Sequence, residues 1–335
     1  MFLENYSRVL AGVMMCMIFA QQGYSACIPS YGSSKRHNRE GYESHAPEST
    51  LPASPVIASH LDTNPTPTKG IVPTFTPTTS PDAPKVSGIR ATSGDLIIPF
   101  YLYPSEGAWT PMIELIKANP DVKFTIIINP DNGPGSTALP DENFLAAVPK
   151  LTAHDNALVI GYVRTDKGSR DIAEVKKDIE TYAGWASASG DTSFTVHGIF
   201  LDEAPSKYHE NTVTYFKDLT SHIKEAKGLG PSNYVITNPG AVPDAAYLEI
   251  PDSTVIFESP YSEFQQAWSS DVFQSILGQD LSRFASMVYD VPSDVDISTV
   301  LTQLRAISSQ TYISNLDTYQ AFDSAWHKVV SLLSV

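Results

Sequence analysis

Three carboxylate residues follow short apolar runs in the second half of the chain. Asp202 and Glu203 come directly after GIFL, and Glu258 comes directly after STVIF. Hydrolysis of a glycosidic bond needs two carboxyl groups, because one protonates the leaving oxygen while the other attacks the anomeric carbon or activates a water molecule. The three residues are therefore candidates for nucleophilic and acid–base chemistry on a sugar.

A structural interpretation of the same carboxylates stays open at this point. Asp202 could cap the turn that follows its strand, and Glu258 could pair with Arg164 in a network without catalytic function. Neighbouring side chains on a strand point to opposite faces, so Asp202 and Glu203 cannot both reach one sugar atom unless the strand has already turned. We therefore expect one of them to act on the substrate and the other to support it.

The segments that must position these residues alternate between strand and helix patterns from Gly94 onward. About eight short apolar runs, each followed by an amphipathic stretch, span about 240 residues, as in a (β/α)8 TIM barrel of the α/β class. The fifth helical pattern, near AAYL, is weak. An open doubly wound sheet is the alternative, although no glycine-rich loop follows the first strand. The predicted strands are 96–103, 123–129, 157–164, 197–202, 233–238, 253–258, 284–289 and 310–314.

Polar and aromatic residues near the predicted strand ends are candidates for substrate binding. The reacting groups of a TIM barrel lie at these ends, where such side chains can hydrogen-bond hydroxyls or stack on sugar rings. The tyrosines could equally be packing residues, and the two asparagines, each followed by proline, could equally fix turns. Trp185 and Trp326 lie in helical patterns and are expected in the core. The candidates are Tyr103, Trp109, Asn129, Tyr162, Arg164, Asn238, Tyr261 and Tyr289.

Histidine and cysteine are absent from the predicted strand ends, which argues against a zinc site or a Cys/His nucleophile. His197 lies at the start of its strand and is interpreted as structural. The histidines at 154, 209, 222 and 327 lack the spacing of a metal-dependent deacetylase. We expect neither a metal nor another cofactor. A net charge of −15 opposes binding to nucleic acid and anionic lipid, and suits neutral or cationic partners.

The first 93 residues differ in composition from the rest. An apolar run at 9–20, VLAGVMMCMIFA, predicts a signal peptide within residues 1–27, with an uncleaved membrane anchor as the alternative. Residues 28–93 are rich in Pro, Ser and Thr, which predicts a disordered stalk. Cys16 and Cys27 precede the predicted barrel at 94–335, so no disulfide framework is expected there. We expect a secreted, wall-associated or surface-associated protein.

The predicted barrel resembles the Spherulin 4 family. That family includes fungal hydrolases of galactosaminogalactan, an exopolysaccharide of galactose, N-acetylgalactosamine and galactosamine. The resemblance runs from Leu96 to the end of the chain and rests on LIIPFYLYPS, IIINPDNGPG, GYVRT, GIFLDEAP, TNPG and FESPY. GIFLDEAP is the most specific of these, because its adjacent Asp202 and Glu203 match the family's acidic pair. Glu258 matches the family's third essential carboxylate.

The resemblance implies endo-hydrolysis of α-1,4-linked N-acetylgalactosamine or galactosamine with retention of configuration. The acetamido group of such a sugar is cis to the leaving group, so a protein carboxylate must attack instead. We expect Asp202 as nucleophile, Glu258 as general acid/base and Glu203 in support, although Asp202 and Glu203 could exchange roles. Retention would place the two reacting carboxyl groups about 5 to 5.5 Å apart, against about 6.5 to 9.5 Å for inversion.

Two other functions stay open for the same residues. One is hydrolysis of a different wall polysaccharide, because the chemistry of the site would be shared. The other is a non-catalytic wall or spore-coat protein that keeps the barrel for binding glycan. A lost carboxylate would indicate such a protein, and all three carboxylates are present. A monomer is the default expectation for the oligomeric state.

Overall fold

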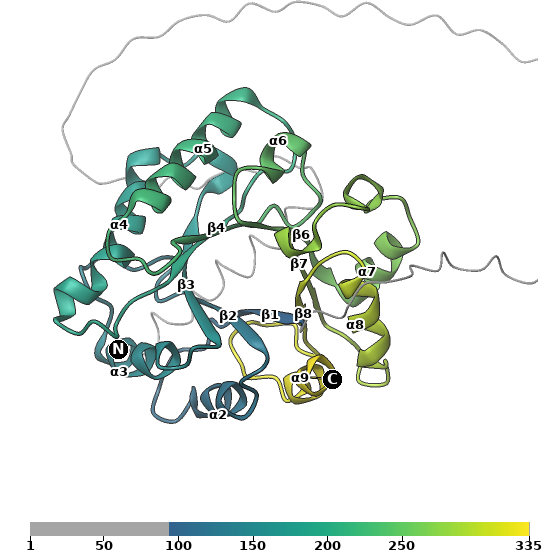
Figure 1. Cartoon of the computed structure of the whole chain (residues 1–335), viewed down its shortest axis with the longest axis horizontal. Coiled ribbons are helices and arrows are strands. Elements are labelled where there is room, and N and C mark those ends of the chain that lie inside the picture. The colour runs from purple at the N-terminus through teal and green to yellow at the C-terminus, as the bar shows by residue number, and fades with distance from the viewer. Residues whose placement is uncertain (1–93, 335) are drawn as a thin grey trace, which may run out of the picture. The chain divides into compact units, whose positions relative to one another are not determined.

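The computed structural model describes residues 94–334, which form a closed barrel of parallel strands surrounded by helices (Figure 1). The strands follow one another around the barrel in chain order, and pairing of Asp95 with Gln310 and of Leu96 with Thr311 joins the first strand to the last. The strands are β1 (Asp95–Pro99), β2 (Lys123–Ile128), β3 (Ala157–Arg164), β4 (Gly198–Asp202), β5 (Tyr234–Thr237), β6 (Ser253–Pro260), β7 (Phe284–Tyr289) and β8 (Gln310–Ile313).

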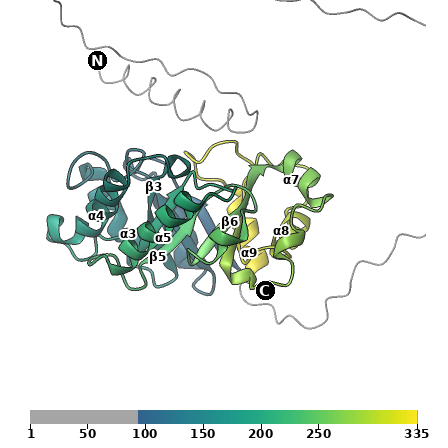
Figure 2. The same ribbon diagram turned by 90° about the horizontal axis from the view of Figure 1, so that it is seen from above.

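A helix follows each strand, so the predicted (β/α)8 architecture is confirmed. The helices are α2 (Thr110–Ala118), α3 (Glu142–Thr152), α4 (Ile172–Ser189), α5 (Glu210–Glu225), α6 (Ala245–Leu248), α7 (Tyr261–Trp268), α8 (Ile297–Arg305) and α9 (Ala325–Leu333). Three short 3-10 turns are η1 (Asp166–Gly168), η2 (Gln274–Ile276) and η3 (Leu281–Arg283). The weak fifth pattern is indeed a short helix, the four residues of α6. Figure 2 shows α3, α4 and α5 in the left half of the view, around β3 and β5, and α7 and α8 in the right half.

The core lies inside the barrel and between the strands and the helices. Strands covered on both faces are expected to be almost continuously apolar, and five of the six residues of β2 are buried. Trp185 of α4 and Trp326 of α9 are 0% and 1% exposed, which confirms their predicted place in the core. The packing of helices against strands fixes the strand ends, and these ends carry the site.

A β-bulge in β6 sets the direction of the side chains at its end. Val255 pairs with Ala285 of β7, and Phe257 pairs with Ser286. Two steps along β6 therefore match one step along β7, which makes Ile256 an extra residue in the ladder.

The bulge turns Glu258 toward the inside of the barrel. Glu258 pairs with Met287, which lies two residues after Ala285 and so shares its face of the sheet. Val255 and Glu258 therefore point to the same side although they are three positions apart in the chain. Phe257 points outward, where its ring packs against an aromatic ring of α7. Strict alternation from Val255 would have turned Phe257 inward in place of Glu258.

Residues 1–93 and 335 lie outside the described part of the chain. The predicted signal peptide or anchor and the predicted stalk fall within that N-terminal range, so both stay predictions. Cys16 and Cys27 lie in the same range. Between residues 94 and 334, no helix has the length and apolar character needed to cross a membrane.

Candidate active site

Asp202 is the last residue of β4, and its carboxylate is buried at the carboxyl end of the barrel strands. Its Oδ1 accepts a hydrogen bond of 2.7 Å from Nδ2 of Asn238. The Tyr162 hydroxyl and the backbone N–H of Glu203 also donate to it. Burial raises the pKa of Asp202, and these three donors oppose that rise by stabilising the ionised form. Asp202 is thus a buried carboxylate surrounded by donors.

Glu258 lies near the end of β6, after the bulge, and both of its carboxylate oxygens accept hydrogen bonds. Oε2 accepts from Nδ2 of Asn238 at 2.5 Å, and Oε1 accepts from the Tyr319 hydroxyl at 2.6 Å. Burial and the negative charge of Asp202 raise the pKa of Glu258 to about 7, although both hydrogen bonds act to lower it. A carboxyl group with this pKa can hold a proton at mildly acidic pH and release it.

Asn238 joins the two carboxylates, because one amide nitrogen donates to both. Asp202 Oδ1 and Glu258 Oε2 can lie no more than 5.2 Å apart, the sum of their 2.7 and 2.5 Å contacts with Nδ2. The amide itself is fixed, since its Oδ1 accepts the N–H of Gly240 at 3.0 Å. Of the two roles considered for Asn238, binding of sugar hydroxyls and fixing of the turn, the structure shows the turn contact, and it adds a bridge between the carboxylates that the sequence did not predict.

Glu203 has left the strand direction that Asp202 still follows. Its φ is 54°, and its side chain is 33% exposed. Oε2 of Glu203 lies 3.9 Å from Nη1 of Arg164, whereas Glu258 contacts Asn238. Burial and the charge of Asp202 raise the pKa of Glu203. The structure therefore pairs Arg164 with Glu203, unlike the structural network considered from the sequence, which paired Arg164 with Glu258.

A group of tyrosine rings lies beside the carboxylates. The ring of Tyr319 meets those of Tyr101, Tyr289 and Tyr312 edge to face, at centroid distances of 5.7, 6.0 and 5.6 Å. Tyr162 meets Tyr101 in the same way at 5.7 Å. Burial raises the pKa of all five hydroxyls, so they stay protonated and can serve as donors at neutral pH. Tyr162 thus lies beside Asp202 and Tyr289 beside Glu258, and a role of either ring in binding sugar stays a prediction.

Tyr319 is a site residue that the candidate list missed, as are Tyr101 and Tyr312 of the same ring group. It lies six residues beyond the end of β8, in the loop before α9, and not at a strand end. Its backbone carbonyl accepts the N–H of Tyr101 at 3.0 Å, which brings the loop back over the first strand. An aromatic residue in the last βα loop could have indicated a site residue, because the βα loops of a TIM barrel form its active site at the carboxyl ends of the strands.

Three further candidates have local partners. The Tyr103 hydroxyl donates to Asp141 at 2.9 Å and so lies at the start of α3. Asn129 Oδ1 accepts the N–H of Gly133 at 2.9 Å, so it fixes the turn after β2. Tyr261 is the first residue of α7 and packs, partly buried, against the core.

Trp109 was predicted to bind substrate, and this prediction is wrong because its side chain is buried. Its side chain is only 3% exposed, and its ring packs against Phe100 and Phe144. Its Nε1 donates to the carbonyl of Leu102 at 2.8 Å. Because the ring faces are covered and the indole N–H is used, Trp109 is a core residue of the first βα unit.

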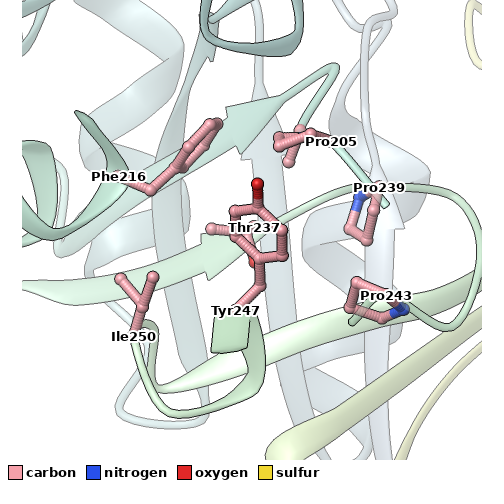
Figure 3. Close-up of a pocket in the computed structure, with 8 residues that line it drawn as sticks. Pro205, Phe216, Thr237, Pro239, Pro243, Tyr247 and Ile250 are labelled. Atoms are coloured by element: carbon pink, nitrogen blue, oxygen red, sulfur yellow. The ribbon is translucent and has the colours of Figure 1, made fainter. Parts of the chain in front are cut away.

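The three carboxylates line neither of two cavities in residues 94–334. A small one of about 10 Å³ lies among Pro205, Thr237, Pro239 and Tyr247 (Figure 3), and it has room for about one water molecule. A larger one of about 520 Å³ includes His197 at the opposite end of the strands. In residues 94–334, no three His, Cys, Asp or Glu side chains are placed to hold a metal ion.

Comparisons with known proteins find a matching family model, a related sequence and a related structure. The family model described as Spherulation-specific family 4, Spherulin 4, matches residues 95–333. Spherulin-4 from Physarum polycephalum is 37% identical over 185 residues, which make up 54% of this chain and about half, 51%, of that relative. The crystal structure of Aspergillus clavatus Sph3 in complex with GalNAc is similar with a TM-score of 0.70 and 38% identity, and the match covers 73% of this chain and 98% of that one.

Proposed function

The chain belongs to the Spherulin 4 family, and on that premise we propose that it is an endo-acting glycoside hydrolase of α-1,4-linked N-acetylgalactosamine or galactosamine. The observation that carries the proposal is the hydrogen bonding of Asp202 and Glu258 to the single amide nitrogen of Asn238. The resulting limit of 5.2 Å applies to one oxygen of each group, Asp202 Oδ1 and Glu258 Oε2, and it supports the spacing of about 5 to 5.5 Å in retaining enzymes over the 6.5 to 9.5 Å or so of inverting ones. The GalNAc bound to the Sph3 relative supports the choice of sugar.

In the proposed mechanism, Asp202 attacks the anomeric carbon while Glu258 gives its proton to the leaving oxygen. The glycosidic bond breaks and a covalent bond forms between the sugar and Asp202. Glu258, now a carboxylate, takes a proton from water, which attacks the anomeric carbon and releases Asp202. Two displacements restore the original α-configuration, and Glu258 regains its proton.

The surroundings of the two carboxyl groups suit these different roles. Asp202 receives hydrogen bonds from Tyr162, Asn238 and a backbone N–H, all of which favour the ionised form that a nucleophile needs. Glu258, with a pKa of about 7, is mostly protonated at mildly acidic pH and can act as the acid. In this proposal Asp202 is therefore the ionised carboxylate of the pair, and Glu258 is the protonated one.

Glu203 supports this pair from a more exposed position. Its side chain is a third exposed, and its Oε2 lies 3.9 Å from Nη1 of Arg164. It can therefore accept a hydrogen bond from a hydroxyl group or an ammonium group of the sugar. In this proposal Asp202 is the nucleophile, because its partner Asn238 also bonds Glu258, whereas the partner of Glu203 is Arg164.

The test is incubation of the purified protein with galactosaminogalactan, chitin and β-glucan, with measurement of new reducing ends. We expect release from galactosaminogalactan, with the α-anomer as the first product seen by NMR. Glu258→Gln should abolish release. Release from another polymer alone would identify a different wall polysaccharide as the substrate, and binding without release would identify a glycan-binding protein. A first product with the β-configuration would refute retention.

We also propose that the protein acts outside the cytosol, secreted or held at the cell surface. The apolar run at 9–20 and the Pro-, Ser- and Thr-rich stretch before the barrel support this location. Fractionation of cells that express the full chain, with N-terminal sequencing, tests it. A new N-terminus near residue 27 would indicate a cleaved signal, whereas an intact N-terminus in the membrane fraction would indicate an anchor. An intact cytosolic protein would refute the proposal.

A further inference from the structure

We propose that Tyr319 is a positioning residue for Glu258, and that its hydroxyl stays hydrogen-bonded to this carboxyl group whether or not the group carries a proton. The inference rests on the proposed function, because it assigns a partner to the residue that acts there as acid and base. Three observations support it: the geometry of the contact, the chemistry of the two donors, and the way the Tyr319 ring is held.

The contact is short and fixes one of the two carboxylate oxygens. The Tyr319 hydroxyl lies 2.6 Å from Glu258 Oε1, within the range of about 2.5 to 2.7 Å of O–H bonds to ionised oxygens. Asn238 Nδ2 holds the other oxygen, Oε2, at 2.5 Å. Because each oxygen has its own donor on a different βα unit, rotation of the carboxylate would break both bonds.

The two donors differ in what they can do when Glu258 takes up a proton. An amide nitrogen such as Nδ2 of Asn238 can only donate, so it serves a carboxylate oxygen that carries no proton on that side. A tyrosine hydroxyl can donate to a carboxylate or accept from a carboxylic acid. Tyr319 can therefore reverse its hydrogen bond as Glu258 alternates between its acid and base forms, without any movement of the side chain.

The Tyr319 ring is held firmly enough for this purpose. It lies among Tyr101, Tyr289 and Tyr312, whose rings meet it at centroid distances of 5.6 to 6.0 Å. The backbone of Tyr319 is also fixed, since its carbonyl accepts the N–H of Tyr101. The hydroxyl can therefore hold its place beside Glu258.

A buried carboxylate anchors both ends of the loop that presents Tyr319. Asp323 is 4% exposed, and its Oδ2 accepts from the Ser314 hydroxyl at 2.7 Å and from the backbone N–H of Asn315 at 2.6 Å. Its Oδ1 accepts the N–H of Ala325 at 2.8 Å. The loop between β8 and α9 is thus tied to the end of β8 on one side and to the start of α9 on the other.

The groups that face Glu258 determine the direction of the expected effect. They are Asp202 on β4 and the hydroxyls of Tyr101, Tyr289, Tyr312 and Tyr319. None of these is a cation. Burial and Asp202 raise the pKa of Glu258, whereas the hydrogen bonds from Tyr319 and Asn238 lower it. Loss of the Tyr319 hydroxyl should therefore raise this pKa further.

The experiment compares Tyr319→Phe with Tyr312→Phe, which removes a hydroxyl from the same ring cluster without removing a donor to Glu258. The titration of Glu258 is followed by carbon-13 NMR of labelled glutamate carboxyl groups, with Glu258→Gln to assign the signal. In Tyr319→Phe we expect the pKa of Glu258 to rise by about one pH unit. The basic limb of the kcat/KM profile should move up by the same amount, and kcat should fall about tenfold or more. Tyr312→Phe should leave the basic limb in place.

An unchanged titration of Glu258 in Tyr319→Phe would overturn the proposal. A lower activity with an unmoved basic limb would overturn it too, because it would reduce Tyr319 to a packing residue. If the protein hydrolyses no glycan, the proposed function fails, but the NMR titration still decides the role of Tyr319. If Tyr319→Phe does not fold, 3,5-difluorotyrosine at position 319 keeps the ring and strengthens the donor. It should lower the pKa of Glu258, and no change would count against the proposal.

Discussion

Asp202 and Glu203 are neighbours in the chain, but their side chains have different surroundings. Asp202 is still part of β4 and is 8% exposed, whereas Glu203 has a φ of 54° and a side chain that is 33% exposed. A left-handed φ is sparsely populated for a residue other than glycine and costs on the order of 1 kcal/mol. The strand therefore turns between the two residues, and only Asp202 shares a donor with Glu258.

Substitution of the two acidic neighbours should have very different effects on hydrolysis. Asp202→Asn should lower kcat more than about a thousandfold, because it removes the proposed nucleophile. Glu203→Gln keeps the shape of a residue that supports the site, and should lower kcat/KM by about ten- to a hundredfold. Steady-state rates of reducing-end release measure both effects.

The comparison also decides between the two possible nucleophiles. Small external anions such as azide can replace a missing carboxylate nucleophile once the side chain is shortened. Azide should restore bond cleavage in Asp202→Gly, with a β-glycosyl azide as product, and should not restore it in Glu203→Gly. Rescue of Glu203→Gly alone would exchange the two roles.

Asn238→Asp should disrupt the site with little change in shape. An aspartate keeps an oxygen that can accept the Gly240 N–H, but it replaces the Nδ2 donor that serves Asp202 and Glu258. It also adds a third carboxyl group beside two buried ones. We expect kcat to fall about a hundredfold or more, as when one preorganised donor is removed from an active site. Initial rates at saturating substrate measure this loss.

Asn129→Asp is the matched control for that variant. Asn129 also precedes a proline after a strand, and its Oδ1 also accepts a turn N–H, that of Gly133. The structure gives it no contact with Asp202 or Glu258 among the hydrogen bonds of residues 94–334. Its loss of kcat should be far smaller. Equal losses in the two variants would show that the turn, and not the bridge between carboxylates, is what the reaction needs.

The positions of Asp202 and Glu258 at strand ends could be predicted from the sequence, because each residue follows an apolar run. Asp202 comes after GIFL and Glu258 after STVIF, and a closed barrel brings the ends of such runs together. Asp202 and Glu203 do have different surroundings, but a turn of the backbone at Glu203, and not strand alternation, separates them. The positive φ of Glu203, which separates them, has no signal in the sequence, since glutamate is an uncommon residue in that conformation.

Tertiary features explain what the sequence did not predict. The extra residue Ile256 in β6 is visible only in the ladder with β7, and without it alternation would turn Phe257 inward. Tyr319 reaches the site through a loop whose backbone pairs with Tyr101, more than two hundred residues earlier in the chain. Trp109 follows a strand end as predicted, but Phe144 of the next unit covers it. In each case a contact distant in sequence decides where the side chain lies.

Truncation of Trp109 should affect stability and leave substrate binding unchanged. Its ring is 3% exposed and packs against Phe100 and Phe144, so Trp109→Ala should lower the free energy of unfolding by about 3 to 5 kcal/mol. KM of the folded variant should match the wild type within about twofold. Urea unfolding and steady-state kinetics measure the two quantities. If KM instead rises tenfold and stability matches the wild type, Trp109 binds substrate after all.

The stability of the protein should fall as the pH rises from about 4.5 to 7, and Glu258 should be a main cause. The pKa of Glu258 is raised from 4.5 to about 7 in the folded state by burial and by Asp202. In this interval the folded state binds more protons than the unfolded state, so a rise in pH favours unfolding, by about 1.4 kcal/mol for each pH unit between the two pKa values. Urea unfolding at several pH values should show a smaller fall for Glu258→Gln than for the wild type. Glu106→Gln, at an exposed position, should keep the wild-type slope. Equal slopes for the wild type and Glu258→Gln would mean that Glu258 titrates near its ordinary value and cannot be the acid at mildly acidic pH.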